Sequence, residues 1–271
     1  MGPPEYHRRV PLRNAVFAGL YHCGRTLQRA ATLWFYAAAG AARLTDLRAA
    51  IEREWDEGGA SQWETYNWSG LMPWERDFYL RFLKPDDRIL VIGCGTGRDL
   101  LGLLQLGYKA EGLDVAPKCA AIAAQLVQKR GFEAPVCTGA IETIALPGRF
   151  DVFIFAWFCY SYIPQSMTRI GVLQKLRDCL NPGGRILVTY APAKTLPRHL
   201  PIRLTQLVAA LSGSDWRPEY GDFIQVADRG RYFVHYEHQF TREGLEKEAR
   251  AAGLTVAFHE GADQGTAALI A

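Results

Sequence analysis

A short glycine-rich stretch directly after an apolar run constrains the fold more than any other feature of this chain. The run Ile89–Ile92 is followed by the segment Gly93–Gly97 and then by a helix-forming segment, Leu100–Leu106. Such a run predicts a buried parallel strand, and glycines allow the backbone to turn sharply and approach a ligand. A second apolar run ends at Asp114, whose carboxylate suits ribose hydroxyl groups. Together these features predict a nucleotide-like cofactor site.

Apolar runs and helix-forming segments alternate from Asp87 onward. This alternation predicts a parallel sheet covered by helices on both faces, in a doubly wound α/β fold. The expected strands are 88–92, 109–113, 134–137, 151–156 and 185–190, and the expected helices are 100–106, 116–129 and 167–180. Residues 231–240 alternate like a further strand, and 254–259 and 266–270 are expected to complete the sheet. The motif Asn181–Gly184 is expected to separate a helix from the fifth strand, because proline cannot continue the helix.

The first part of the chain has a different character. Residues 12–53 are rich in Ala, Leu and Arg and predict two helices with a break, and Glu57–Ser61 is a turn-rich seam after them. We therefore expect an N-terminal helical extension at 1–60 and a catalytic domain at 61–271. Within that domain, the proline-rich residues 191–229 interrupt the alternation and predict an insertion that caps the substrate.

Charge and cysteine content limit the class of protein. The net charge of +3 is too small to predict nucleic-acid binding. The six cysteines lack the spacing of zinc ligands or of a disulfide framework, so we expect reduced, buried side chains and a cytoplasmic protein. Residues 30–42 are apolar but shorter than the about 20 residues that a membrane-spanning helix needs.

Five segments, in order and spacing, resemble motifs of the class I S-adenosylmethionine (SAM)-dependent methyltransferases. They are Val91–Gly97, Gly112–Val115, Phe150–Val152, Leu180–Arg185 and Phe240–Leu245. The spacing of Gly93, Gly95 and Gly97 differs from that of a dinucleotide fingerprint, whose third glycine would fall at Arg98. The resemblance covers about residues 86–271. It implies a Rossmann-like, seven-stranded mixed sheet with an antiparallel last strand, and SAM as the cofactor.

The resemblance also implies the cofactor-binding residues. The glycines would pass close to the methionyl part of SAM, Asp114 would accept hydrogen bonds from the ribose, and Val115 would pack on the adenine. Where many family members carry an acid near the adenine amine, this chain has Ala140, so that a backbone contact or Glu142 would have to serve. The full expected set is Gly93, Cys94, Gly95, Gly97, Asp114, Val115, Ala140, Ile141, Trp157 and Tyr66.

The segment after the fourth strand indicates the substrate class. In the family this segment lies beside the transferred methyl group, and members that methylate nucleic-acid amino groups carry an Asn/Asp-Pro-Pro-Tyr type motif there. This chain instead has Ala156–Tyr160, an aromatic stretch that suits a small or lipid-like acceptor and a sulfonium cation. Asp151 stands at the opposite end of that strand, where we expect a structural role.

Methyl transfer needs alignment of donor and acceptor, and a base only if the acceptor loses a proton. None of the candidate bases stands out; they are Tyr160, His199, His235, Glu237 and His238. A metal site at 235–238 is not expected, because His235 and Glu237 face one side of a strand and His238 the other.

The sequence thus predicts a class I methyltransferase that acts on an O, N or S atom of a small molecule. The alternatives are a lipid methyltransferase at a membrane surface and a catalytically silent SAM-binding or scaffold protein. The N-terminal 50 residues contain seven arginines and only two carboxylates. These basic helices are compatible with three roles: packing on the core, forming a homodimer, or binding an anionic membrane surface.

Overall fold

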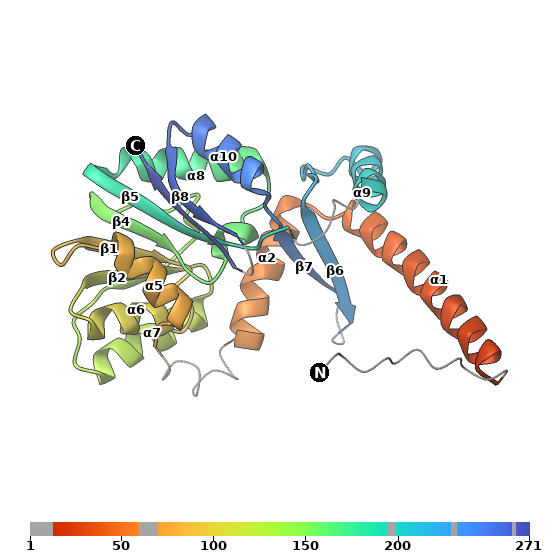
Figure 1. Cartoon of the computed structure of the whole chain (residues 1–271), viewed down its shortest axis with the longest axis horizontal. Coiled ribbons are helices and arrows are strands. Elements are labelled where there is room, and N and C mark those ends of the chain that lie inside the picture. Colours follow the sequence, from red (N-terminus) through yellow and green to blue (C-terminus); the bar gives the residue numbers. More distant parts are fainter. Residues whose placement is uncertain (1–12, 60–69, 194–198, 229–231, 262–263) are drawn as a thin grey trace, which may run out of the picture.

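The computed structural model describes residues 13–59, 70–193, 199–228, 232–261 and 264–271. A seven-stranded sheet forms its centre, in the order β3-β2-β1-β4-β5-β9-β8 (Figure 1). The first five strands pair in parallel, and β9 is antiparallel to both of its neighbours. The strands are β1 (Arg88–Ile92), β2 (Lys109–Asp114), β3 (Val136–Thr138), β4 (Phe150–Phe155), β5 (Leu180–Tyr190), β8 (Thr255–Glu260) and β9 (Gly265–Ile270). The expected Rossmann-like mixed sheet with an antiparallel last strand is confirmed.

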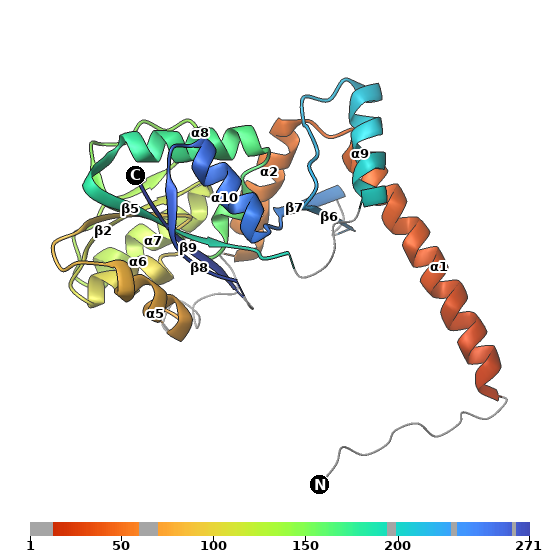
Figure 2. The ribbon, with the colours of Figure 1, turned by 45° about the horizontal axis from the view of Figure 1, so that its top comes forward.

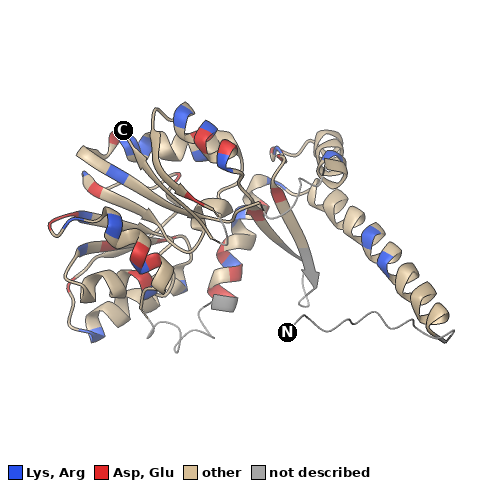
Figure 3. Ribbon diagram, viewed as in Figure 1, with Lys and Arg blue, Asp and Glu red and all other residues tan. Residues whose placement is uncertain are grey.

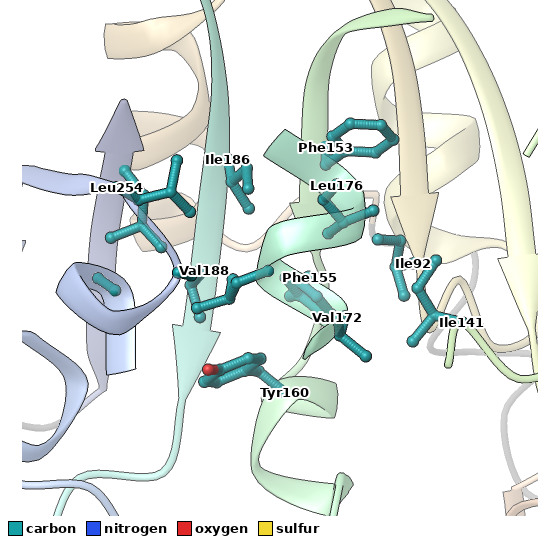
Figure 4. Packing of buried hydrophobic residues seen from close by; sticks show 14 of the residues in the cluster. Ile92, Ile141, Phe153, Phe155, Tyr160, Val172, Leu176, Ile186, Val188 and Leu254 are labelled. Carbon is teal, nitrogen blue, oxygen red and sulfur yellow. The ribbon is translucent and has the colours of Figure 1, made fainter. Parts of the chain in front are cut away.

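Helices cover both faces of this sheet, as the alternating pattern predicted. On one face the buried side chains of α8 (Ser166–Asp178) and α10 (Arg242–Ala251) pack against β4 and β5. Val172 and Leu176 of α8 lie among Phe155, Ile186 and Val188 in Figure 4. The other face is covered by α5 (Pro73–Phe82), α6 (Arg98–Gln105) and α7 (Pro117–Lys129).

The boundary before β5 differs from the prediction. Helix α8 ends at Asp178, and β5 already begins at Leu180, so Asn181–Gly184 forms an irregular first part of the strand and not a separate turn. The register between β4 and β5 shifts between Phe150 and Val152. Gly184 lies so close to the backbone that an added Cβ would stand 2.9 Å from the Asp151 carbonyl oxygen. Proline and glycine permit this local departure from regular pairing.

A second, smaller unit lies beside the sheet. It contains α1 (Arg13–Ala39), α2 (Leu44–Glu54), η1 (Trp55–Gly59), α9 (His199–Ser212) and a separate two-stranded sheet of β6 (Asp222–Asp228) and β7 (Tyr232–His238). The strand expected at 231–240 is therefore β7, outside the main sheet. Segments from both ends of the sequence share one core, in which Tyr36 and Leu47 pack with Ile202, Trp216 and Tyr236.

Most of α1 projects away from the rest of the molecule (Figures 1 and 2). The break predicted in the N-terminal helical region lies between Ala39 and Leu44. Among the described residues, no helix has both the length and the apolar character needed to cross a membrane. All six cysteines are free, but Cys23 and Cys137 are exposed, which corrects the expectation that they are buried.

Candidate functional site

A cavity of about 340 Å³ opens at the carboxyl ends of β1, β2 and β4. This is the edge at which open parallel sheets place their ligands, and the volume is within the usual range of small-molecule sites. The cavity is lined by the glycine-rich turn after β1, the ends of β2 and β4, the turn after β3, the short helix η2 (Cys159–Tyr162), and α2 with Trp55. Eight of the ten predicted cofactor residues line it, namely Gly93, Cys94, Gly95, Asp114, Val115, Ala140, Ile141 and Trp157.

The turn after β1 is shaped by glycines with positive φ angles. Gly93 has φ +71°, and a Cβ added there would stand 2.6 Å from Cβ of Cys159 in η2. The Gly93 amide donates to the Leu113 carbonyl at 2.8 Å, which fixes the turn against β2. Gly95 has φ +53° and no atom within 4 Å of an added Cβ, so its backbone faces open space. A ligand can therefore approach this part of the main chain closely.

Asp114 stands at the end of β2 with its carboxylate oriented by two backbone amides. The Gly95 amide donates to Oδ2 at 2.7 Å and the Ala116 amide to Oδ1 at 2.8 Å. Burial raises the pKa of this carboxyl group, while the two amide hydrogen bonds act in the opposite direction. Since a carboxylate offers about four acceptor positions, the group keeps acceptor capacity for a ligand hydroxyl.

Gly97 is the predicted cofactor residue that the described cavity does not include. It has φ +99° and precedes α6, and an added Cβ would stand 3.1 Å from Cβ of Ala123 in α7. Its small size therefore serves the packing of α6 against α7. Tyr66, the remaining prediction, lies outside the described residues.

Ala140 and Ile141 line the cavity beside the end of β2. The Ala140 carbonyl already accepts from the amides of Thr143 and Ile144, at 3.0 and 2.9 Å. Glu142 also lines the cavity, where Arg48 of α2 lies 3.8 Å from its Oε1. The Glu142 carboxylate is therefore close to an arginine of the N-terminal region.

A buried charge network below the glycine-rich turn was not predicted. Arg98 pairs with the carboxylates of Glu75 and Asp99, and the Tyr79 hydroxyl donates to Asp99 at 3.1 Å. Burial raises the pKa of Glu75 to about 7. The guanidinium carbon of Arg98 lies 4.8 Å from the centre of the Trp157 ring. The network joins α5 to the first turn of α6 and to the cavity wall. The only sign of it in the sequence is the adjacent pair Arg98 and Asp99 directly after the glycine-rich turn.

Trp157 enters the cavity from a strained turn. Trp157 and Phe158 have φ angles of +42° and +61°, which side-chain-bearing residues rarely adopt. The turn is held by the Phe158 amide, which donates to the Thr189 hydroxyl at 2.8 Å. Trp74 of α5 stacks on Phe158 with ring centres 5.9 Å apart.

The candidate bases Tyr160, His199, His235 and His238 are not among the described residues that line the cavity. Tyr160 is fully buried, and its hydroxyl donates to Glu248 at 2.8 Å. His238 is also buried, with Nδ1 2.8 Å from Asp222. His235 faces Glu54 at 2.9 Å, and the His199 ring lies 4.9 Å from that of Tyr220. The alternation of polar and apolar residues in the sequence does not reveal these partners, because each of them comes from a distant segment of the chain.

Asp151 occupies the structural position expected for it. Its carboxylate accepts from the Arg88 amide and from the Asn181 side chain, both at 2.8 Å. These hydrogen bonds hold the pKa of Asp151 below its usual value. The residue therefore joins strand ends at the edge opposite the cavity.

The N-terminal region forms one wall of the cavity, which the sequence did not indicate. Arg48, Ile51 and Glu52 of α2 line it together with Trp55. The Lys118 amide donates to Asp56 at 2.9 Å, and the Cys119 thiol lies 3.3 Å from the Trp55 carbonyl, so η1 is fixed to α7. Tyr162 packs edge-on against Trp55, with ring centres 5.7 Å apart, and lines the cavity together with Ile163. No described residue of the insertion 191–229 is in the lining.

Glu219, Asp222 and His238 form a cluster of possible metal ligands outside the cavity. Their polar atoms already have partners: Asp222 accepts from Tyr236 and faces His238, and Glu219 pairs with Arg169. The cluster is accordingly explained as a hydrogen-bonded tie between the small sheet and α8.

Comparisons with known proteins agree with the fold. A family model described as a methyltransferase domain matches residues 70–258. Ribosomal protein L11 methyltransferase from Thermus thermophilus is 28% identical over 139 residues, which are 51% of this chain and 48% of that protein. The chain thus matches about half the length of this curated relative.

Solved structures share the fold at low sequence identity. A SAM-dependent methyltransferase from Clostridium acetobutylicum has a TM-score of 0.53 at 15% identity, over 82% of this chain and 96% of that one. One from Methanosarcina mazei has a TM-score of 0.55 at 19% identity, over 74% and 97%. The glycopeptide N-methyltransferase MtfA, in complex with SAM, has a TM-score of 0.51 at 19% identity, over 72% and 84%.

Proposed function

The chain belongs to the family of methyltransferase domains and uses SAM as its cofactor, and we propose that it methylates an O, N or S atom of a small-molecule acceptor. The observation that carries the proposal is that the glycine-rich turn and Asp114 face one cavity, which continues to α2 and Tyr162. A cofactor region and an acceptor region therefore adjoin each other, as transfer between two bound molecules requires.

The described residues fit SAM. Asp114, with its two amide donors, is placed to accept from both ribose hydroxyls, and the turn at Gly95 admits the ligand close to the backbone. We propose that Ala140 and Ile141 contact the adenine and that Trp157 lies beside the sulfonium, which an aromatic face attracts. When bound, SAM supplies a methyl group on a positively charged sulfur. The chain's own residues then need only align the acceptor and exclude water.

The acceptor region supports a small molecule with an apolar or aromatic part. Ile51, Trp55, Tyr162 and Ile163 line it, and few polar groups interrupt them. We propose that the insertion 191–229 acts on this region through α2, because Asp215 accepts from the Leu44 amide at 2.8 Å. The second unit would thereby close the acceptor side without entering the cavity.

We propose Glu52 as the residue that takes the acceptor's proton. Four carboxylates line the cavity, and the described structure ties three of them to other groups: Asp99 to Arg98, Asp114 to two amides, and Glu142 to Arg48. Glu52 lies on the exposed side of α2, among the acceptor-region residues. It can hold a proton removed from a hydroxyl, ammonium or thiol group of a neighbouring acceptor.

The cofactor assignment is tested with Asp114→Ala. Loss of a charge-assisted acceptor should weaken binding of S-adenosylhomocysteine by about 1–3 kcal/mol in calorimetry. Asp86→Ala is the matched control, because Asp86 is an exposed carboxylate at the opposite edge of the sheet. Equal affinity of the two variants would contradict the assignment.

The acceptor class is tested by turnover with labelled SAM. The protein is incubated with a panel of small hydroxyl, amine and thiol metabolites and, separately, with ribosomal protein L11. Label in a small molecule supports the proposal. Label confined to the protein, or SAM binding with no product from any acceptor, would overturn it.

A further inference from the structure

Helix α1 presents a large apolar surface that no described part of the chain covers. The described residues include fourteen large hydrophobic side chains that are exposed, and seven of these lie on α1 and three on α9. On α1 they are Val16, Phe17, Leu20, Tyr21, Leu27, Trp34 and Phe35. Scattered apolar residues are normal on a protein surface, but a concentration of this kind marks an interaction site.

The apolar residues follow one side of the helix. Val16, Leu20, Leu27 and Trp34 are separated by four, seven and seven positions, which places them in one stripe at 3.6 residues per turn. Arg25 and Arg29 lie on roughly the opposite side. Phe17 and Phe35 widen the apolar arc beyond the narrow seam that a two-stranded coiled coil needs.

Helix α9 anchors α1 without covering this stripe. The Thr205 hydroxyl donates to the Tyr36 carbonyl at 2.9 Å, and a Cβ added to Gly40 would stand 2.5 Å from the Thr205 carbonyl oxygen. Tyr36 follows Trp34 by two positions, about 200° around the helix, so α9 packs on the other side. Trp34 accordingly remains 76% exposed.

Acidic residues are missing from both helices. The sequence contains no Asp or Glu from residue 6 to 45 or from 179 to 214, although the chain has 28 in total. Figure 3 shows blue bands but no red ones on α1 and α9, whereas both colours mix over the sheet domain. Segments far apart in the sequence thus combine into one acid-free, cationic region.

We propose that α1 lies on an anionic lipid surface, with the Val16–Trp34 stripe in the interface and its arginines near lipid phosphates. An apolar arc, an interfacial tryptophan and arginines on the polar face are what such helices require. A second copy of α1 fits less well, since neither helix would offer a carboxylate to the other's arginines. α1 lacks the apolar character to cross the bilayer, so it lies along the surface.

The test is co-sedimentation of the full chain with phosphatidylcholine vesicles that do or do not contain phosphatidylglycerol. Binding is expected only with phosphatidylglycerol and should weaken as salt is raised. The double variant Leu27→Ser, Trp34→Ser keeps the charge and should lower partitioning about tenfold or more. Met167→Ser is the matched control, because Met167 is 77% exposed on α8, in the sheet domain. Arg25→Gln with Arg29→Gln should reduce the preference for phosphatidylglycerol.

Three outcomes would overturn the proposal: no binding of the unmodified protein, equal binding of the double variant, or a stable dimer in light scattering that the double variant converts to a monomer. The last result would assign the stripe to a second copy. Binding of S-adenosylhomocysteine is measured on each variant and should not change. A failure of lipid binding is therefore distinguishable from a failure of the proposed methyl transfer.

Discussion

The cofactor side of the cavity comes from neighbouring strands, whereas its acceptor side comes from segments far apart in the sequence. Gly93 and Trp157 follow parallel strands of the main sheet and Asp114 ends another, so the sheet alone brings them to one edge. Helix α2 has no such framework. Asp215 holds its first residue, Leu44, and His235 faces Glu54 at its last turn.

The two sides of the cavity therefore differ in how they respond to substitutions. Strand ends in a paired sheet are fixed by many backbone hydrogen bonds, so one side chain can change without moving its neighbours. The position of α2 depends on side-chain contacts with distant parts of the sequence, namely hydrogen bonds across about 170 to 180 residues and the packing of Leu47 and Ile51 in the core of the second unit. The acceptor side is therefore the part that can shift with pH or with substitutions distant from the cavity.

The largest expected effect is on the acceptor side. Glu52→Gln removes the proposed proton acceptor but keeps its size, and turnover should fall about 100- to 10,000-fold if the acceptor must lose a proton. Affinity for S-adenosylhomocysteine should stay the same, since the proposed role of Glu52 is to take a proton from the acceptor and not to bind the cofactor. Steady-state kinetics and calorimetry measure both quantities. An unchanged turnover would remove Glu52 from the proposal.

A smaller effect is expected from Gly93→Ala on the cofactor side. The new Cβ combines left-handed backbone strain of about 1–2 kcal/mol with overpacking against Cys159 of about 1–3 kcal/mol. Gly107→Ala separates the two causes, because Gly107 has φ +88° but nothing within 4 Å of an added Cβ. Urea unfolding should show a larger loss for Gly93→Ala. Equal losses would mean that the contact with η2 adds nothing.

The cofactor side was largely accessible from the sequence because local patterns determine it. An apolar run, glycines and an acid at the end of the next run specify a strand, a turn and a second strand end, and the sheet supplies the rest. The spacing of Gly97 in the cofactor motif does not reveal its contact with Ala123, which is a tertiary packing constraint.

The acceptor side was not accessible for the opposite reason. The strand pattern at 231–240 was recognised, but its partner strand β6 and its separation from the main sheet depend on long-range pairing. His235 and His238 therefore seemed free for chemistry, although Glu54 and Asp222 face them. α2 carried no motif at all, and only its packing with Tyr162 and β7 places Glu52 in the cavity wall.

The smallest expected effect concerns the contact that holds α2 to the small sheet. The hydrogen bond to Glu54 raises the pKa of His235 above its ordinary value of 6.5. A raised histidine pKa stabilises the folded protein below pH 6.5, and this contribution is lost as the pH rises through the folded-state pKa. We expect the free energy of unfolding to fall by about 1 kcal/mol across that interval. His235→Gln and Glu54→Gln should each abolish this dependence in urea titrations at successive pH values; if either variant retains it, another group holds α2 in place.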